Sequence, residues 1–407
     1  MRRLGPLFLA ALALFLQAPE LRAQGGAALS TTLDASVRSA GMGRASSAVF
    51  WGGDPDAWAN PALLGYHEGV RFEYGRTQLV PDLADDVTFK TRRITLGAYG
   101  LGILLAGKPV DGAGSMRLSY GTSQATGPGG EDLGTYESYE EIRAFGIGLS
   151  LAQATEALWR ASGHTPPPLA RYGDVALGMT KKDVTVFLSP SFSGMPGVGG
   201  DGTAEDRGLF LRLSPYNTFD RDGEAAGFAK VMRARLDLGH GRSTINRGQP
   251  LVDLGPDVGS EPMIEESRKG WSTHVALHPV ALDRSLEDAR LGWLARSLSP
   301  AFSLGAAWED QTERFSTRGA STDESAIDKH GWELTLLNIV SMRRGHYSDP
   351  DGSIDGPTTG WSVGFALVGV AGFRYDRATV PQALDLAKVH RKAWSFFIDP
   401  LRAMREL

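Results

Sequence analysis

The chain has 407 residues, a formal net charge of −5, 42% hydrophobic residues and no cysteine. Without cysteine it has no disulfides, no thiol nucleophile and no cysteine for a lipid anchor. The mildly acidic charge and the lack of any Lys/Arg block beyond pairs argue against a nucleic-acid partner.

The first 23 residues predict a secretory signal peptide. Arg2 and Arg3 form a basic start, residues 6–16 are an apolar run of eleven, and a cleavage position follows at Ala23. Such a run is too short to span a membrane, and a buried core helix is the alternative. Removal of this segment leaves about 384 residues with a net charge of about −7, and we expect an exported protein.

Short runs of alternating apolar and polar residues recur along the remaining chain. Alternation with a period of two is typical of strands that are buried on one face only. The longest run, 361–375, has its large apolar and aromatic residues at odd positions, and we expect one strand of about fifteen residues there. The other runs are VRFEY (70–74), MRLSY (116–120), 185–192, 207–216, MRARLDL (232–238), FSLGAAWE (302–309), 330–342 and KAWSFFI (392–398).

These runs favour a transmembrane antiparallel β-barrel over a soluble sandwich. The run at 361–375 exceeds the usual strand length, and its aromatic ends suit the girdles at two membrane interfaces. Strands alternate with short turns and long Gly/Asp-rich loops, as in outer-membrane barrels. We predict an all-β barrel of about fourteen strands with a few short helices. The charged residues expected to fill its lumen are Arg71, Glu73, Arg117, Arg212, Arg233, Arg235, Asp237 and Glu333.

Two segments, 150–163 and 280–299, have helical spacing and directly follow strand-like runs. Their apolar residues recur at three- and four-residue intervals. We expect both to be short helices at the rim of the barrel, packed on the strands or lying at the membrane interface.

No catalytic or metal-binding motif stands out. The G-x-S-x-G, H-E-x-x-H and Walker patterns are absent. His274 and His278 would lie about 13 Å apart on a strand, too far for one metal ion. The Asp-rich stretches 348–356 and 219–224 lack the full calcium loop and read as β-turns. We expect no catalytic residue, no metal and no cofactor.

The phrases RSAGMGRASSAVF (38–50) and DPDAWANPALLG (54–65) resemble the N-terminus of the PorV/PorQ family, a branch of the larger FadL/OmpP1/TodX-like group of outer-membrane proteins. A turn-like stretch at 79–89 also resembles PorV-like chains. Three features depart from the pattern: Arg44 replaces a usual glycine, the spacing between Asp54 and Asn60 is about one residue shorter than the commoner form, and the chain does not end on an aromatic residue. The matching motif residues are Gly41, Met42, Gly43, Asp54, Asn60, Pro61 and Ala62.

The resemblance implies an N-terminal plug at 24–68, an outer-membrane barrel at 69–399 and a tail at 400–407. Pro55 and Pro61 fix two φ angles and remove two N–H donors, which leaves fewer polar groups to satisfy inside a barrel. Asn60 is biased to an extended conformation by the proline that follows it, and its amide is free to bond the inner wall. A plain N-terminal loop on a soluble domain is the alternative.

The resemblance implies a non-enzymatic protein of the outer membrane, in contact with its lipid. The first role is a PorV/PorQ-like accessory of a type IX-like secretion system, with secretion proteins or exported cargo as partners. The alternative is a FadL-like channel for passive uptake of small hydrophobic compounds. A third possibility is a soluble periplasmic β-rich protein, such as a sandwich or a carbohydrate-active enzyme.

Overall fold

The computed structural model describes most of the chain beyond the predicted signal peptide, which lies outside the described residues. Part of the Asp-rich stretch 219–224 also lies outside them. The described residues are 28–107, 116–127, 129–191, 197–219, 227–248, 251, 262–316, 322–383 and 386–406.

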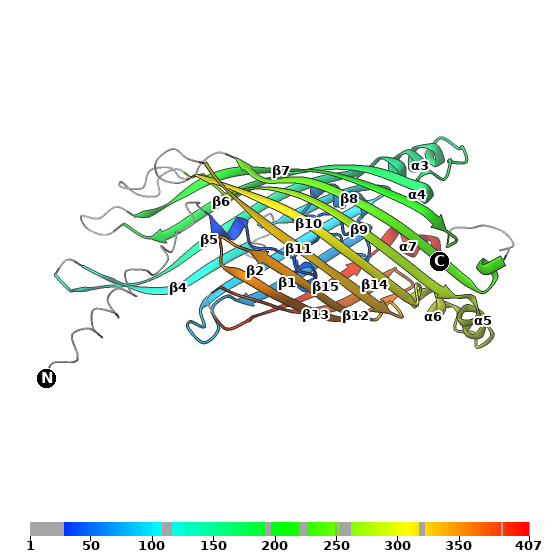
Figure 1. The fold of residues 1–407 in the computed structure, drawn as a ribbon. Helices are drawn as coiled ribbons and strands as arrows, with labels where there is room; N and C mark the ends of the chain where they lie inside the picture. The colour runs from blue at the N-terminus through cyan, green and yellow to red at the C-terminus, as the bar shows by residue number, and fades with distance from the viewer. Residues whose placement is uncertain are drawn as a thin grey trace, which may run out of the picture.

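Fifteen strand segments form one antiparallel sheet that closes on itself, because β1 pairs with β15 on one side and with β2 on the other. β3 and β4 share one position, since each pairs with both β2 and β5. The barrel therefore has fourteen strand positions, which confirms the prediction (Figure 1). The strands are β1 Gly69–Gln78, β2 Val87–Ala98, β3 Leu101–Ala106, β4 Met116–Thr126, β5 Asp132–Ser150, β6 Gly173–Ser189, β7 Val198–Asn217, β8 Met232–Gly248, β9 Glu265–Pro279, β10 Phe302–Ser316, β11 Thr322–Leu336, β12 Val340–Asp349, β13 Ile354–Leu367, β14 Ala371–Val380 and β15 Val389–Ile398.

The α-helices that follow β1 gather at the end of the barrel where β1 begins and β15 ends, which we call the helical end (Figure 1). The opposite end, which carries the β1–β2 turn, is the hairpin end. The helices are α3 Leu151–Ala161, α4 Leu169–Tyr172, α5 Val280–Asp288, α6 Gly292–Ser297 and α7 Pro400–Glu406, with the 3-10 turn η3 at Gly227–Lys230. The stretch predicted at 280–299 is thus two helices, and Arg290 between them has a φ of 61°.

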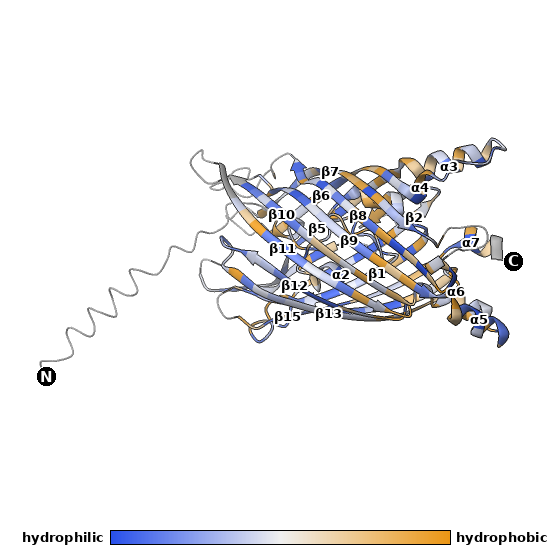
Figure 2. Cartoon of the chain, turned by 45° about the vertical axis from the view of Figure 1, so that its right-hand side comes forward, coloured by the Kyte–Doolittle hydropathy of each residue, from blue (hydrophilic) through white to orange (hydrophobic). Residues whose placement is uncertain are grey.

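The two faces of the sheet differ as in a membrane barrel. On β1, Val70 and Phe72 point outward and are each 41% exposed, whereas Arg71 and Glu73 point into the lumen and are buried. Outward apolar residues concentrate toward the helical end on strand after strand (Figure 2). Apolar outward and polar inward residues are the pattern that a lipid environment selects. No helix within the described ranges is long and apolar enough to cross a membrane.

Two predicted single strands are hairpins. Within 361–375, β13 ends at Leu367 and β14 begins at Ala371, and Val368 and Gly369 turn the chain at positive φ. Within 330–342, the chain turns at residues 337–339. The alternation continues through the first turn because Leu367 pairs with Ala371 and Val363 with Tyr375. Odd positions therefore stay on the outer face of both strands, and the pattern alone hides the turn.

The side-chain orientation predicted for MRLSY is also wrong. Met116 and Leu118 face the lumen and are buried, while Arg117 faces outward. Arg117 there forms an ion pair with Glu137 at 2.9 Å and lies over the ring of Tyr139. The prediction assumed a polar lumen throughout, but the inner wall at β4 is apolar.

Candidate functional site

Residues 28–68, here called the inner segment, cross the lumen and contact strands on all sides of it. The segment contains η1 Leu29–Thr31, α2 Val37–Ala40 and η2 Pro61–Tyr66. Backbone or side-chain hydrogen bonds join it to β5 through Glu140, to β8 through Asn246 and to β13 through Thr358. The lumen at this level is therefore filled by the chain's own N-terminal part.

A row of glycines lets the inner segment approach the wall. Gly97, Gly102, Gly148, Gly178 and Gly208 are register partners on five adjacent strand positions. A Cβ at any of them would come closer than 3.0 Å to atoms of the stretch 60–67, mostly backbone. Because the Cβ of any other residue would overlap these atoms, only glycine permits this contact.

Glycines on the opposite wall receive the first motif. Gly331, Gly345 and Gly360 lie against Met42, Gly43 and Gly41 respectively, with no room for a Cβ at the first two and a tight fit at the third. Gly43 has a φ of 67°, and its N–H donates to Thr358 Oγ1 at 2.8 Å. The hydroxyl of Thr358 donates in turn to the carbonyl of Gly41. The Gly-Met-Gly phrase is thus fitted to β11–β13.

Asn60 joins the second motif to both the wall and the first half of the inner segment. Its amide Nδ2 donates to the carbonyls of Ser47 at 2.8 Å and Leu209 at 3.1 Å. Its Oδ1 accepts from the N–H of Ala62, which caps the start of η2 at Pro61. Asn60 is fully buried, so a loss of these bonds would leave polar groups unsatisfied.

The main ionic anchor of the inner segment is Arg38, on α2. Its guanidinium meets both oxygens of Glu333 on β11, with Nε–Oε2 at 2.9 Å and Nη2–Oε1 at 2.5 Å. Arg343 also bonds Glu333, and the indole N–H of Trp51 donates to it at 3.2 Å. All four side chains are buried. One carboxylate thus balances cations from the wall and from the inner segment.

A second anchor is Glu309 on β10. Its Oε2 accepts from the backbone N–H groups of Ser46 and Ser47, at 3.0 and 2.8 Å, and Lys329 Nζ lies 3.0 Å from its Oε1. Arg268 on β9 lies 3.8 Å from the same carboxylate.

The third anchor lies among β6–β8. Lys182 pairs with Asp206 at 2.8 Å, donates to Asn246 at 2.8 Å and lies over the ring of Trp58 from the inner segment. A desolvated ammonium over an indole face is attracted to it.

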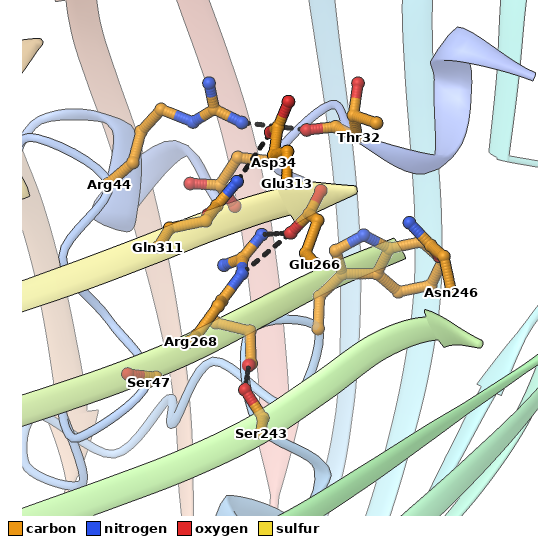
Figure 3. A network of polar contacts seen from close by, with 12 residues as sticks. Thr32, Asp34, Arg44, Ser47, Ser243, Asn246, Glu266, Arg268, Gln311 and Glu313 are labelled. Carbon is orange, nitrogen blue, oxygen red and sulfur yellow. Dashed lines mark hydrogen bonds and ion pairs between the residues drawn. The ribbon is translucent and has the colours of Figure 1, made fainter. Parts of the chain in front are cut away.

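Figure 3 shows polar contacts within the inner segment and within the wall, toward the hairpin end. Arg44 donates from Nη2 to the carbonyl of Thr32 at 2.8 Å, while Arg268 bonds Glu266 on its own strand. Arg44 adopts a left-handed conformation, with a φ of 63°. That conformation favours glycine, and here it is adopted by an arginine. Here the side chain also lies over the ring of Tyr347, at 4.7 Å.

Among the titratable groups of the inner segment, burial and neighbouring charges shift the pKa values of Asp54, Asp56 and His67. Burial and the nearby Asp34 raise the pKa of Asp56 to about 6. Burial and Arg71 lower the pKa of His67 to about 4. The pKa of Asp54 lies well below its usual range: burial opposes ionisation, but the charges of Arg71 and Arg93 outweigh it.

The seven motif residues do not converge on one point. Gly41, Met42 and Gly43 contact β11–β13, Asn60, Pro61 and Ala62 contact β5–β8, and Asp54 lies 3.9 Å from Arg71 on β1. They are attachment points spread around the lumen rather than a ligand site. Sequence reasoning missed three anchoring residues: Arg38, Glu309 and Lys182. Arg38 could have been found as a charge close to the Gly41–Gly43 phrase. Glu309 and Lys182 could have been found as charges at strand positions that face the lumen.

The inner wall has two different halves. Over β2–β7 it carries an apolar strip, which packs against Trp58 and Leu64 of the inner segment. Over β9–β15 it carries the buried ionic groups around Glu309 and Glu333, while the Lys182–Asp206 pair of the third anchor lies on β6 and β7 beside the strip. The strip consists of Phe89, Leu104, Ala106, Met116, Leu118, Ile142, Ala144, Val184, Val186 and Ala204, with Leu251 and Met263 from the β8–β9 connection against it.

A cavity of about 330 Å³ lies between the inner segment and the helical end. Trp51 and Tyr66 of the inner segment line it, together with Phe397 on β15. Arg71 and Arg374 add charge to the same lining. The cavity thus offers both aromatic surface and cations.

The two histidines considered above point into the lumen. His274 lies 2.8 Å from Ser303 and 3.3 Å from Asp237, and His278 lies 2.7 Å from Asp283. Across the described ranges, no group of three or more His, Asp or Glu side chains is arranged to hold a metal ion.

No family model and no curated protein sequence matches the chain. Similar solved structures include the Pseudomonas putida toluene transporter TodX, at 9% identity over 89% of this chain and 97% of that one, with a TM-score of 0.39. The Ralstonia pickettii toluene transporter TbuX has 10% identity over 89% and 97%, with a TM-score of 0.40. A Pseudomonas aeruginosa FadL homologue has 11% identity over 89% and 98%, with a TM-score of 0.35. With identities and TM-scores this low, the function of those proteins cannot be assigned to this chain. The evidence for a closed barrel is the chain's own strand pairing.

Proposed function

We propose that this protein is an outer-membrane channel through which small hydrophobic compounds pass, with the inner segment as its plug. The observation that carries the proposal is the apolar strip over β2–β7. The interior of a membrane barrel is ordinarily polar, and a strand such as β4 here turns Met116 and Leu118 inward. An apolar inner wall lowers the free energy of a hydrophobic solute inside the lumen relative to water.

The plug blocks an open water path. The ionic anchors and the close backbone contacts at the glycines hold residues 28–68 across the lumen, and the cavity beneath opens toward the helical end. A hydrophobic compound that follows the strip meets Trp58 and Leu64, which pack against it. Passage therefore requires a local shift of the plug rather than its complete release.

The test is uptake of radiolabelled toluene by cells that produce the protein, with a hydrophilic sugar as the second solute. We expect Val184→Glu, in the strip, to reduce toluene uptake and leave sugar exclusion unchanged. Val184→Thr makes the same position more polar while keeping the shape of the side chain, and it replaces Val184→Glu if that variant does not fold. Ser325→Ala, on the opposite wall, is the control, because the buried Ser325 hydroxyl has no partner in the described structure. Equal toluene uptake by all variants and by cells without the protein would overturn the channel.

The location is tested separately by extraction. A barrel with this outer face requires detergent, so recovery in the aqueous fraction after lysis without detergent would favour the soluble periplasmic alternative and exclude the membrane barrel.

A second candidate is the secretion role, which the resemblance of the two N-terminal phrases to the PorV/PorQ family favours. In that role the helices at the helical end would contact other proteins of a type IX-like system. Deletion of the protein would then leave exported cargo in the periplasm and toluene uptake unaltered, which distinguishes it from the channel.

A further inference from the structure

The outer face of β14, β15 and β1 carries side chains of like kind in successive rows, and the corresponding residues on β2 are Ile94, Arg92 and Lys90. One outward row, next to that of Ala371, Ile398 and Val70 at the helical end, consists of Phe373, Phe396 and Phe72, which are register neighbours. The next outward position on each strand holds Tyr375, Trp394 and Tyr74. The rings of Tyr375 and Trp394 are 4.3 Å apart. Tyr and Trp gather where hydrocarbon gives way to headgroups, so this second row marks a membrane interface.

The next outward row toward the hairpin end consists of basic side chains. Arg377 pairs in register with Lys392, Lys392 with Arg76, and Arg76 with Lys90. We call these four residues the basic sector. Arg76 and Lys392 are exposed, and Lys90 and Arg377 are half-buried. Each neighbouring pair sets two like charges directly opposite one another, which is destabilising unless an anion lies between them.

The described part of the chain supplies no such anion. None of the four cations forms an ion pair or hydrogen bond with a described residue. Cations at the same level on the far side of the barrel do have acids opposite them. Lys269 faces Asp310 on one side and Arg242 on the other, Lys181 faces Glu205, and Arg143 faces Asp183. Each of these cations thus has an acid on a neighbouring strand, whereas none of the four cations of the basic sector has an acid as a register partner.

We propose that the basic sector binds a membrane lipid whose headgroup carries two phosphates, in the leaflet at the hairpin end. The aromatic row places the four cations at headgroup level, and their register spacing sets them side by side. A headgroup with two phosphates balances several of these charges, whereas a zwitterionic headgroup brings no net charge. Bound this way, the lipid relieves repulsion between adjacent strands at the β15–β1 closure.

The experiment uses the full-length protein in nanodiscs of phosphatidylcholine, with and without diphosphoryl lipid A. Native mass spectrometry after release into detergent counts retained lipid A. The variant is R76Q/R377Q/K392Q, and the matched control is R143Q/K181Q/K269Q, which removes the same charge from the compensated side. At about 1 kcal/mol for each cation near a membrane surface, we expect the first triple to weaken retention roughly 100-fold. The control should stay within a few-fold of the unmodified protein.

Further arms identify the source of the phosphate. Monophosphoryl lipid A should be retained less well than the diphosphoryl form, and soluble pyrophosphate should not displace either at physiological salt. Heat-dependent migration of unboiled samples reports whether each variant still forms the barrel, and single substitutions replace the triple if it does not. Equal retention by both triples, or binding of soluble pyrophosphate without lipid retention, overturns the proposal.

Discussion

The guanidinium of Arg38 on the inner segment meets the carboxylate of Glu333 on β11 through two contacts, at 2.9 and 2.5 Å, with both side chains buried. The two residues are 295 positions apart in the chain. A paired arginine and carboxylate fix orientation as well as distance. This contact therefore sets where the inner segment lies against the far wall of the barrel.

Replacement of Glu333 by Gln should loosen the inner segment. The change leaves Arg38, Arg343 and Arg374 without their shared counter-charge. Removal of one partner from a buried ion pair costs about 3–5 kcal/mol. Protease cleavage within residues 28–68 of the intact barrel should become faster. Glu137→Gln is the control, because its ion pair with Arg117 is solvent-accessible and should contribute little. Equal cleavage in both variants would show that Glu333 is not an anchor.

Substitution of Gly178 by Ala should displace η2. The added methyl would fall within contact distance of the backbone at Pro61 and Ala62, and overpacking of this kind costs about 1–3 kcal/mol. Hydrogen exchange at residues 61–66 should rise. Gly292→Ala is the matched change, since a Cβ there meets nothing closer than 3.6 Å. Unchanged exchange in the Gly178 variant would contradict the close contact.

Protonation of Asp56 should stabilise the docked inner segment. Its pKa is raised from 3.8 to about 6 when docked, so its contribution is fully present below pH 3.8 and is lost as the pH rises through 6. His67, with a pKa lowered from 6.5 to about 4, acts in the opposite direction and loses its contribution as the pH falls through 4. Comparison with Asp56→Asn isolates the first effect, because both proteins keep His67.

Between pH 7.5 and pH 5, opening of the inner segment in the unmodified protein should slow about ten-fold relative to the Asp56→Asn variant. Hydrogen exchange of residues 28–68 measures both rates at each pH. A ratio that does not depend on pH would show that Asp56 does not titrate in this range.

Deletion of residues 41–65 should leave a folded but leaky barrel. The strands pair with one another independently of this stretch, whereas the stretch itself fills the lumen. Conductance in planar bilayers and sugar entry into proteoliposomes should both increase, with resistance of the unboiled barrel to SDS as the control for folding. Unaltered permeability would remove the plug role and leave the barrel intact.

The alternation of apolar and polar residues along each strand predicted the barrel well. It arises directly because one face of the wall meets lipid and the other meets the lumen. VRFEY shows this, since Val70 and Phe72 face outward and Arg71 and Glu73 inward. The prediction failed at 361–375 because the turn at Val368–Val370 preserves the phase of the alternation. It failed at Arg117 because the rule assigns polar residues to the lumen, and the lumen there is apolar.

By itself the sequence indicated the architecture: period-two alternation and the spacing of loops favour an antiparallel membrane barrel, since each strand is read against its immediate neighbours. It also singled out the phrases at 41–43 and 60–62. Only the tertiary structure decided that these phrases meet glycines of opposite walls, and that Arg38, Glu309 and Lys182 join the inner segment to the barrel. Those contacts join residues hundreds of positions apart. Their geometry depends on closure of the sheet, which local sequence patterns do not encode.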